Sequence, residues 1–86
     1  MNPMNRDDTA RAVLAALASV APEADPNAID PKQPLRDQLD LDSMDFLNFI
    51  VALHHDLGVD VPERDYGKLA TLESAVAYLM GTMRAA

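Results

Sequence analysis

Residues 42–58 read Asp-Ser-Met-Asp-Phe-Leu-Asn-Phe-Ile-Val-Ala-Leu-His-His-Asp-Leu-Gly, and this stretch decides the fold of the 86-residue chain. Asp42 is suited to cap a helix and Gly58 to end one, and apolar side chains recur between them at helical spacing. At about 100° per residue, one wide apolar face is formed by Phe46, Phe49, Ile50, Leu53 and Leu57. The stretch therefore predicts a helix over residues 43–57 that packs this face against a core.

A second apolar stripe lies on the opposite side of the predicted helix and consists of Met44, Leu47 and Val51, with Asn48 and His55 among them. One helix of so small a domain can rarely be buried on both sides, so we expect this docking stripe (Met44, Leu47, Val51) to be exposed. From Asp37 to Glu63 the chain carries seven acidic residues and no Lys or Arg. The stripe predicts a surface that binds basic partners, unless the preceding loop covers it.

The segments before this helix predict another helix and a long loop. Residues 9–20 are rich in Ala and Leu, with Asp7 and Asp8 as capping carboxylates and Pro22 beyond the end. Residues 21–42 contain four prolines and no periodicity, which predicts an ordered loop with a turn of helix near residues 35–39. Isolated apolar residues are expected to pin this loop across the core: Ile29, Leu35, Leu39 and Leu41.

The segments after it predict a short helix and a long one. Pro62 is expected at the first position of a helix over residues 63–66 that Gly67 closes. Thr71 is expected to cap a last helix, whose apolar face is formed by Leu72, Val76, Leu79, Met80 and Met83. The prediction is an all-α fold, a small bundle of three main helices plus one short helix with a long first loop. Residues 1–6 are expected to be a flexible tail and residues 7–86 a single domain.

Composition excludes several classes of protein. The chain has no Cys, which rules out disulfides and thiolate metal sites, and no Trp. Its 14 acidic against 7 basic residues give a net charge of −7, the wrong sign for a nucleic-acid binder. No apolar run approaches the roughly 20 residues that span a bilayer, and the first residues lack a signal-peptide pattern. We expect a cytoplasmic, monomeric protein with no membrane span.

The densest polar cluster surrounds Ser43, and two chemistries can be excluded there. A calcium loop that begins at Asp40 would place Met44 and Val51 at ligand positions, where they cannot serve. A serine nucleophile needs a base within reach, but His54 lies eleven residues on, about 16 Å along a helix. Adjacent His54 and His55 point about 100° apart and make a poor metal clamp. The sequence thus predicts no catalytic residue and no metal site.

A third possibility is that Ser43 is modified by another enzyme. Its hydroxyl is expected to be exposed in the first turn of a helix, where the helix dipole favours an anion such as a phosphodiester. The alternative is an ordinary serine at the cap or at the first position of the helix.

The stretch around Ser43 resembles that of the acyl carrier proteins of the phosphopantetheine-carrying family. The resemblance rests on Leu35-Arg36-Asp37-Gln38-Leu39-Asp40-Leu41-Asp42-Ser43-Met44-Asp45-Phe46-Leu47, and continues in Leu53, Leu57-Gly58-Val59, Val61-Pro62 and Leu69-Ala70-Thr71-Leu72. It covers roughly residues 7 to 84 and implies a carrier rather than an enzyme. By this resemblance, a phosphopantetheinyl transferase that requires magnesium would attach 4′-phosphopantetheine from coenzyme A to Ser43.

The resemblance also implies a cargo and partners. An acyl group would be held as a thioester and presented to a ligase, synthase or acyltransferase with a basic docking surface, in fatty-acid, lipid or polyketide-type biosynthesis. The implied docking residues are Asp42, Met44, Asp45, Leu47, Asn48, Val51 and His55. An acyl chain between the helices would be lined by Phe46, Phe49, Ile50, Leu53 and Val61.

Some residues depart from the family pattern. Asp40 stands where a Gly is common, and Asn48, His54 and His55 stand where acidic residues are common. These departures favour a specialised pathway over housekeeping fatty acid synthesis. Two alternatives remain open, a carrier of aminoacyl cargo (D-alanyl or peptidyl) and an unmodified helical module that binds partners through the docking stripe.

Overall fold

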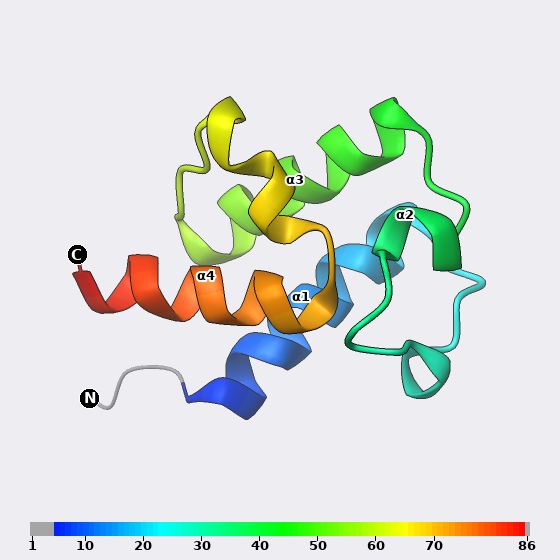
Figure 1. Ribbon diagram of the computed structural model, residues 1–86, viewed down its shortest axis with the longest axis horizontal. Coiled ribbons are helices and arrows are strands. Elements are labelled where there is room, and N and C mark those ends of the chain that lie inside the picture. The colour runs from blue at the N-terminus through cyan, green and yellow to red at the C-terminus, as the bar shows by residue number, and fades with distance from the viewer. Residues whose placement is uncertain (1–4, 86) are drawn as a thin grey trace.

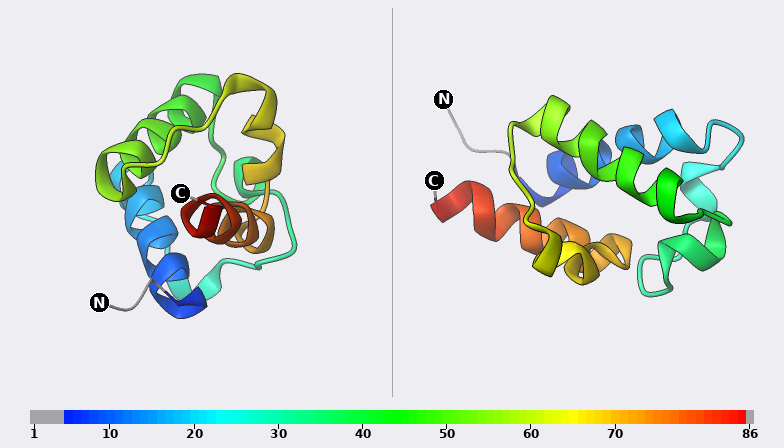
Figure 2. Two further views of the ribbon diagram at one scale, coloured as in Figure 1. Left: turned by 90° about the vertical axis from the view of Figure 1, so that its left-hand side faces the viewer. Right: turned by 90° about the horizontal axis from the view of Figure 1, so that it is seen from above.

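The computed structural model describes residues 5–85 of the chain, with side chains through residue 83. Its elements follow in the order α1 (Arg6–Val20), η1 (Pro26–Ala28), α2 (Leu35–Gln38), α3 (Ser43–Leu57), η2 (Glu63–Leu69) and α4 (Leu72–Ala85). The fold is all-helical, as predicted, with no strand in residues 5–85 (Figure 1). Helices α1, α3 and α4 are the three main helices, and η2 crosses beside α4 (Figure 2).

One hydrophobic core joins these elements. Its largest fully buried side chains come from five different elements: Leu17, Leu35, Phe49, Leu53, Leu69 and Leu79. The predicted core face of α3 is confirmed, since Phe46, Phe49, Ile50 and Leu53 are buried and Leu57 packs against the cluster. On α4, Val76 and Leu79 are buried, and Leu72, Met80 and Met83 lie partly buried beside them.

The start of α1 differs from the prediction. The helix begins at Arg6, and the side chain of Asn5 accepts a hydrogen bond of 2.8 Å from the N–H of Asp8. Asp7 and Asp8 therefore lie in the first turn and are not the cap, although their charges suit the positive end of the helix dipole. The helix thus begins one residue before the expected start of the domain at residue 7, and residues 1–4 of the expected tail lie outside the described residues.

Two backbone hydrogen bonds fasten the interior of the long loop, residues 21–42, to the segment that leads into the first turn of α4. The Leu35 N–H donates to the carbonyl of Ala70 at 2.8 Å, and the Glu73 N–H donates to the carbonyl of Pro31 at 2.9 Å. Leu35 and Leu41 are buried, while Ile29 and Leu39 are partly buried against the core. The predicted pinning of the loop across the core and the predicted turn of helix, α2, are both confirmed.

The short helix η2 differs from the prediction in two respects. Pro62 precedes the helix, and its carbonyl accepts from the Asp65 N–H at 2.8 Å, an i to i+3 bond of 3₁₀ type. Gly67 does not end the helix, because its φ is not positive. The helix extends to Leu69, whose side chain is buried in the core. Thr71 caps α4 as predicted, and its hydroxyl oxygen accepts from the Ser74 N–H at 3.0 Å.

A polar cluster fastens η2 to α4. The Tyr78 hydroxyl donates to the carboxylate of Asp65 at 2.8 Å, and Lys68 lies 3.3 Å from the other oxygen of that carboxylate. The Lys68 ammonium also lies 5.7 Å from the centre of the Tyr78 ring, within cation–π range. Within residues 5–85, no helix is long and apolar enough to cross a membrane.

Candidate functional site

The candidate site is the first turn of α3, which two aspartates cap reciprocally. The Asp42 carboxylate accepts from the Asp45 N–H at 2.8 Å, and the Asp45 carboxylate accepts from the Asp42 N–H at 3.3 Å. This is a capping box with Asp in place of the usual Glu. Asp42 is therefore the cap, as predicted, and of the two ordinary positions considered for Ser43, the cap and the first helical position, Ser43 takes the second. Ser43 is the first helical residue, and its side chain is exposed.

Ser43 differs from the other two serines of the chain in how its hydroxyl is used. The Ser19 hydroxyl donates to the carbonyl of Ala16 at 2.6 Å, within α1. The Ser74 hydroxyl donates to the carbonyl of Thr71 at 3.2 Å and belongs to the cap of α4. The Ser43 oxygen instead accepts a long hydrogen bond of 3.4 Å from Arg36. Ser43 is thus the serine whose hydroxyl is not bonded to the backbone of its own helix.

Arg36 reaches this serine from α2, across the turn that joins α2 to α3. Asp40 lies in that turn with φ of 53°, in the left-handed region that Gly adopts most easily. This turn reverses the direction of the chain and brings the start of α3 beside α2. As a result, Nε of Arg36 lies 3.5 Å from the carbonyl of Leu41, and Nη2 lies 3.4 Å from the Ser43 hydroxyl. The guanidinium carbon also lies 5.8 Å from the centre of the Phe46 ring.

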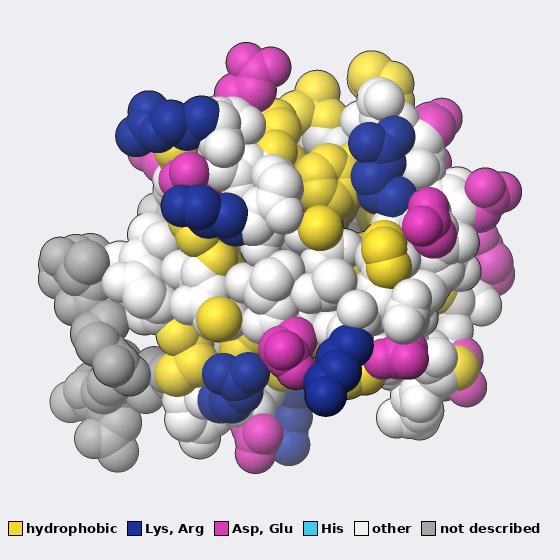
Figure 3. Space-filling view, in the orientation of Figure 1, with side chains coloured by type: hydrophobic (Ala, Val, Ile, Leu, Met, Phe, Trp, Pro, Cys, Tyr) yellow, Lys and Arg dark blue, Asp and Glu magenta, His cyan; other side chains and the backbone are white. Residues whose placement is uncertain are grey.

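A pocket of about 930 Å³ opens beside Ser43, between α2, the start of α3 and η2. Its volume is within the range of small-molecule pockets. Its lining combines apolar and charged side chains: Pro34, Arg36, Asp37, Asp40, Leu41, Ser43, Phe46, Leu47, Glu63, Tyr66, Gly67 and Ala70. Figure 3 shows hydrophobic side chains in a hollow between η2 and the start of α3, with a cationic side chain at its border.

The residues that the family resemblance places around an acyl chain are not gathered at this pocket. Phe46 lines it, but Phe49, Ile50 and Leu53 are buried in the core, and Val61 packs against that core. The Phe46 and Phe49 rings lie 5.8 Å apart at a tilt of 52°, and Phe46 belongs both to the core and to the pocket lining. The pocket therefore borders the core through Leu41 and Phe46, while Phe49, Ile50, Leu53 and Val61 do not line it.

The docking stripe is exposed, as predicted. The exposed fractions are 63% for Met44, 40% for Leu47 and 56% for Val51. The alternative in which the long loop covers them is wrong. Asp42, Asn48 and His55 are also exposed and Asp45 is half-buried, so the seven expected docking residues all reach the surface.

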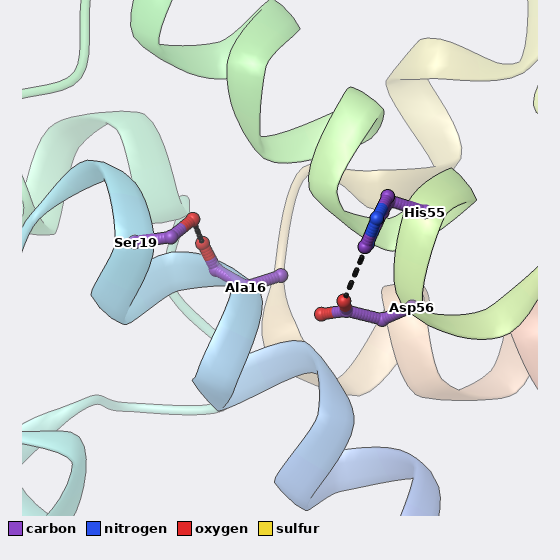
Figure 4. A network of polar contacts seen from close by, with 4 residues as sticks. All are labelled: Ala16, Ser19, His55 and Asp56. Atoms are coloured by element: carbon purple, nitrogen blue, oxygen red, sulfur yellow. Dashed lines mark hydrogen bonds and ion pairs between the residues drawn. The ribbon is translucent and has the colours of Figure 1, made fainter.

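The two histidines contact neighbouring carboxylates. His54 Nδ1 lies 3.0 Å from Asp60 and 3.2 Å from the carbonyl of Val59, beyond the end of α3. His55 Nδ1 lies 3.3 Å from Asp56, as Figure 4 shows beside the separate Ser19–Ala16 bond of α1. Within residues 5–85, no group of three or more His, Cys, Asp or Glu side chains could hold a metal ion.

Two groups with shifted pKa values lie outside the pocket lining. The hydrogen bond from Tyr78 holds the pKa of Asp65 below its ordinary value, against an opposing effect of burial, and Lys68 and Arg64 lower it further. Burial raises the pKa of the Tyr78 phenol, and the hydrogen bond and charge of Asp65 add to that rise. Their role is to join η2 to α4.

Sequence reasoning missed Arg36 and Tyr66 as parts of the site. Arg36 lies within the stretch that carries the family resemblance. Its position as a single cation directly before the acidic segment from Asp37 to Glu63 could have indicated a role at the site. Tyr66 gave no signal, because its position depends on how η2 packs beside α3.

These features define a class of protein: a small helical carrier with an exposed serine at a helix start, a cation beside it and an apolar docking stripe next to it. A family model described as a phosphopantetheine attachment site matches residues 11–79. The chain belongs to this family, that of the phosphopantetheine-carrying acyl carrier proteins.

Relatives with known names agree with the family. The chain is 30% identical over 74 residues to the meromycolate extension acyl carrier protein of Mycolicibacterium smegmatis, covering 83% of this chain and 75% of that protein. It is 29% identical over 72 residues to an acyl carrier protein of Myxococcus xanthus, covering 80% and 91%. It is 28% identical over 76 residues to an acyl carrier protein of Thermosynechococcus vestitus, covering 88% and 93%.

Family membership determines the class of function. The chain is a carrier protein and not an enzyme, and its prosthetic group is 4′-phosphopantetheine, which derives from coenzyme A. That group supplies a thiol on which a carrier can hold cargo as a thioester, which this chain without Cys cannot supply itself. The residues present fit a group linked through phosphate, because an exposed hydroxyl, a guanidinium and an open pocket lie together.

Proposed function

We propose that Ser43 is the residue that carries 4′-phosphopantetheine. The observation that supports this most directly is the different use of the three serine hydroxyls, since those of Ser19 and Ser74 bond their own helices while that of Ser43 faces Arg36. Attachment would form a bond from the Ser43 oxygen to phosphorus as the pyrophosphate bond of coenzyme A breaks. The hydroxyl proton is lost, and adenosine 3′,5′-bisphosphate is the leaving group.

The enzyme that performs this attachment is, in this proposal, a separate magnesium-dependent phosphopantetheinyl transferase. The exposed position of Ser43 in the first turn of α3 gives such an enzyme access to the hydroxyl. The docking stripe and its acidic neighbours Asp42 and Asp45 supply a surface for it. The same surface would then bind the enzymes that load and use the cargo.

The cargo that we propose is an acyl group, held as a thioester and passed among enzymes of fatty-acid, lipid or polyketide-type biosynthesis in the cytoplasm. The names of the relatives favour an acyl over an aminoacyl cargo. Asn48, His54 and His55 weaken the negative charge of α3 where relatives in housekeeping synthesis commonly carry acids, which favours a specialised pathway with dedicated partners. We take residues 7–86 as one carrier domain.

The test is the intact mass of the protein before and after incubation with coenzyme A, magnesium and a phosphopantetheinyl transferase of broad specificity. The wild type and Ser19→Ala are expected to gain one phosphopantetheine, and Ser43→Ala is expected to gain none. Circular dichroism should show equal helicity for all three. A mass gain in Ser43→Ala would overturn the assignment of the serine.

An unmodified wild type with an active control carrier in the same assay would favour the alternative of an unmodified interaction module. The nature of the cargo can be tested on protein purified from its native cells. Neutral hydroxylamine should release an added mass that corresponds to an acyl group, and release of an aminoacyl mass would contradict an acyl cargo.

A further inference from the structure

The guanidinium of Arg36 makes unusually weak contacts for a cation in an acidic region. Asp37, Asp40, Asp42 and Asp45 all lie within nine residues of it in the sequence. Among the described residues, however, no carboxylate forms an ion pair with Arg36, and its polar contacts are a carbonyl at 3.5 Å and the Ser43 hydroxyl at 3.4 Å. Both distances are near the outer limit of a hydrogen bond. The positive charge of Arg36 therefore lies beside Ser43 with no carboxylate paired to it among the described residues.

The guanidinium of Arg36, on an exposed residue, has one further contact, with an aromatic ring. It lies over the Phe46 ring at 5.8 Å, and that ring is held in turn by fully buried Phe49. The cation–π contact and the contact to Leu41 restrict the side chain before any ligand arrives. A group that is already ordered loses less entropy when it binds, so the arrangement favours recognition of an anion at Ser43.

A phosphodiester is the anion that fits this arrangement. Guanidinium groups bind phosphate oxygens through strong, charge-assisted hydrogen bonds, which are shorter and stronger than those to a neutral hydroxyl. The start of α3 alone offers little to an anion, because the carboxylates of Asp42 and Asp45 occupy it. Attachment through Ser43 would bring a further negative charge into this acidic turn, and Arg36 is the cation that lies beside it.

We propose that Arg36 binds the phosphodiester of the prosthetic group and is a positioning residue for it, an inference that rests on the proposed attachment at Ser43. Arg36 and Ser43 both line the 930 Å³ pocket, whereas Met44 and Val51 of the docking stripe do not. Binding of the phosphate by Arg36 directs the arm toward the pocket side of α3, lined by Leu41, Phe46 and Tyr66. Met44 and Val51 of the docking stripe stay free for partners, while Leu47 belongs to both the stripe and the pocket lining.

The experiment compares Arg36→Gln and Arg36→Lys with the wild type and with Arg11→Gln, which removes the same charge from an exposed position on α1 outside the pocket. Each protein is converted to the modified form, and conversion is verified by intact mass. The melting temperature Tm is then measured for the unmodified and the modified form of each at low salt. The ¹⁵N resonances of the arginine side chains and the ³¹P resonance of the phosphodiester are recorded on the same samples.

For each protein, the change in Tm on modification is the Tm of the modified form minus that of the unmodified form. This change is expected to be about 4 °C lower in Arg36→Gln than in the wild type or in Arg11→Gln. Arg36→Lys should recover part of this difference, because it keeps the charge but not the planar fork. The Arg36 side-chain resonance of the wild type should shift on modification while that of Arg11 stays. The ³¹P resonance should move in Arg36→Gln.

Several outcomes would overturn the inference. Complete modification with equal Tm changes in all variants and an unmoved ³¹P resonance would show that Arg36 does not bind the phosphate, while attachment to Ser43 would stand. If Arg36→Gln does not fold or accept the group, the wild-type spectra decide, and an Arg36 resonance that does not move on modification overturns the inference. A wild type that gains no mass overturns the attachment to Ser43 and this inference together.

Discussion

Asp42 and Asp45 bond to each other's backbone N–H groups across the first turn of α3, at 2.8 and 3.3 Å. Ser43 lies between them and is thereby held as the first helical residue, with its hydroxyl exposed beside Arg36. The two carboxylates have a second consequence, because they stand next to exposed Met44 and give the docking stripe an acidic border. One pair of side chains thus fixes both the candidate attachment site and the charge of its surroundings.

Asp42→Ala is expected to lower the free energy of unfolding by about 1 kcal/mol, because the Asp45 N–H loses its capping acceptor. Asp42→Asn keeps an acceptor oxygen and is expected to retain most of that stability. Urea denaturation of the three proteins measures the difference. Equal losses in Asp42→Ala and Asp42→Asn would show that the charge of Asp42 matters and the capping bond does not.

Met44→Glu is expected to slow modification by the transferase by about tenfold or more at low carrier concentration, because it places a charge within the apolar docking stripe. Ala77→Glu, on an exposed position of α4, adds the same charge elsewhere and serves as the matched control. Initial rates of coenzyme A consumption provide the measurement. Equal rates for Met44→Glu and Ala77→Glu would remove the stripe from the docking surface.

Asp40→Gly is expected to raise the free energy of unfolding by roughly 0.5–1 kcal/mol, since Asp40 has φ of 53° and Gly adopts this conformation without strain. Asp40→Ala should lower the free energy of unfolding, because Ala keeps the Cβ and loses the local hydrogen-bonding ability of Asp. Asp40→Asn controls for the lost charge, as Asn tolerates the same backbone conformation. Asp40→Ala that is as stable as Asp40→Gly would contradict a conformational cause.

Gln38→Ala is expected to destabilise the long loop. The Gln38 side chain accepts from the Asp30 N–H at 2.8 Å and donates to the carbonyls of Asp30 and Gln33 at 2.8 and 2.9 Å. Loss of these three bonds should cost roughly 1–2 kcal/mol and speed hydrogen exchange at the Asp30 amide. Gln33→Ala removes an exposed side chain of the same type and should leave that amide protected. Exchange at Asp30 that is unchanged in Gln38→Ala would contradict this role of Gln38.

The sequence predicted α3 closely because all the information needed lies within the helix. Its cap, its core face and its terminating Gly58 are neighbours along the chain, and Gly58 indeed has φ of 67°. The predicted bounds of α1 and η2 were less accurate. Asn5, and not Asp7 or Asp8, caps α1, and Gly67 does not adopt the positive φ that would end η2.

The part of the site that sequence reasoning could not predict depends on contacts between distant segments. The bond between the Leu35 N–H and the Ala70 carbonyl sets the position of α2, and the left-handed Asp40 then turns the chain back. Only with both in place does the Arg36 side chain reach Ser43, seven residues away. The spacing of residues in the sequence predicts neither how the loop aligns with the end of η2 nor where the side chain of Arg36 lies.

Tyr78→Phe is expected to lower the free energy of unfolding at neutral pH, because it removes the hydrogen bond that joins α4 to Asp65 of η2. The pKa of Asp65 is lowered from its ordinary value of 3.8, so the stability from its ionised form is fully present above about pH 3.8 and is lost as the pH falls through the lower, folded value. The pKa of Tyr78 is raised from 10.0, so the stability from its neutral form is present below pH 10.0 and is lost as the pH rises through the higher, folded value. The stability difference between wild type and Tyr78→Phe, measured by urea denaturation across the pH range, should therefore be largest between these limits and shrink beyond both. Tyr66→Phe, which keeps the bond between Tyr78 and Asp65, is the matched control, and a difference for Tyr78→Phe that does not change with pH would contradict the coupling of the two groups.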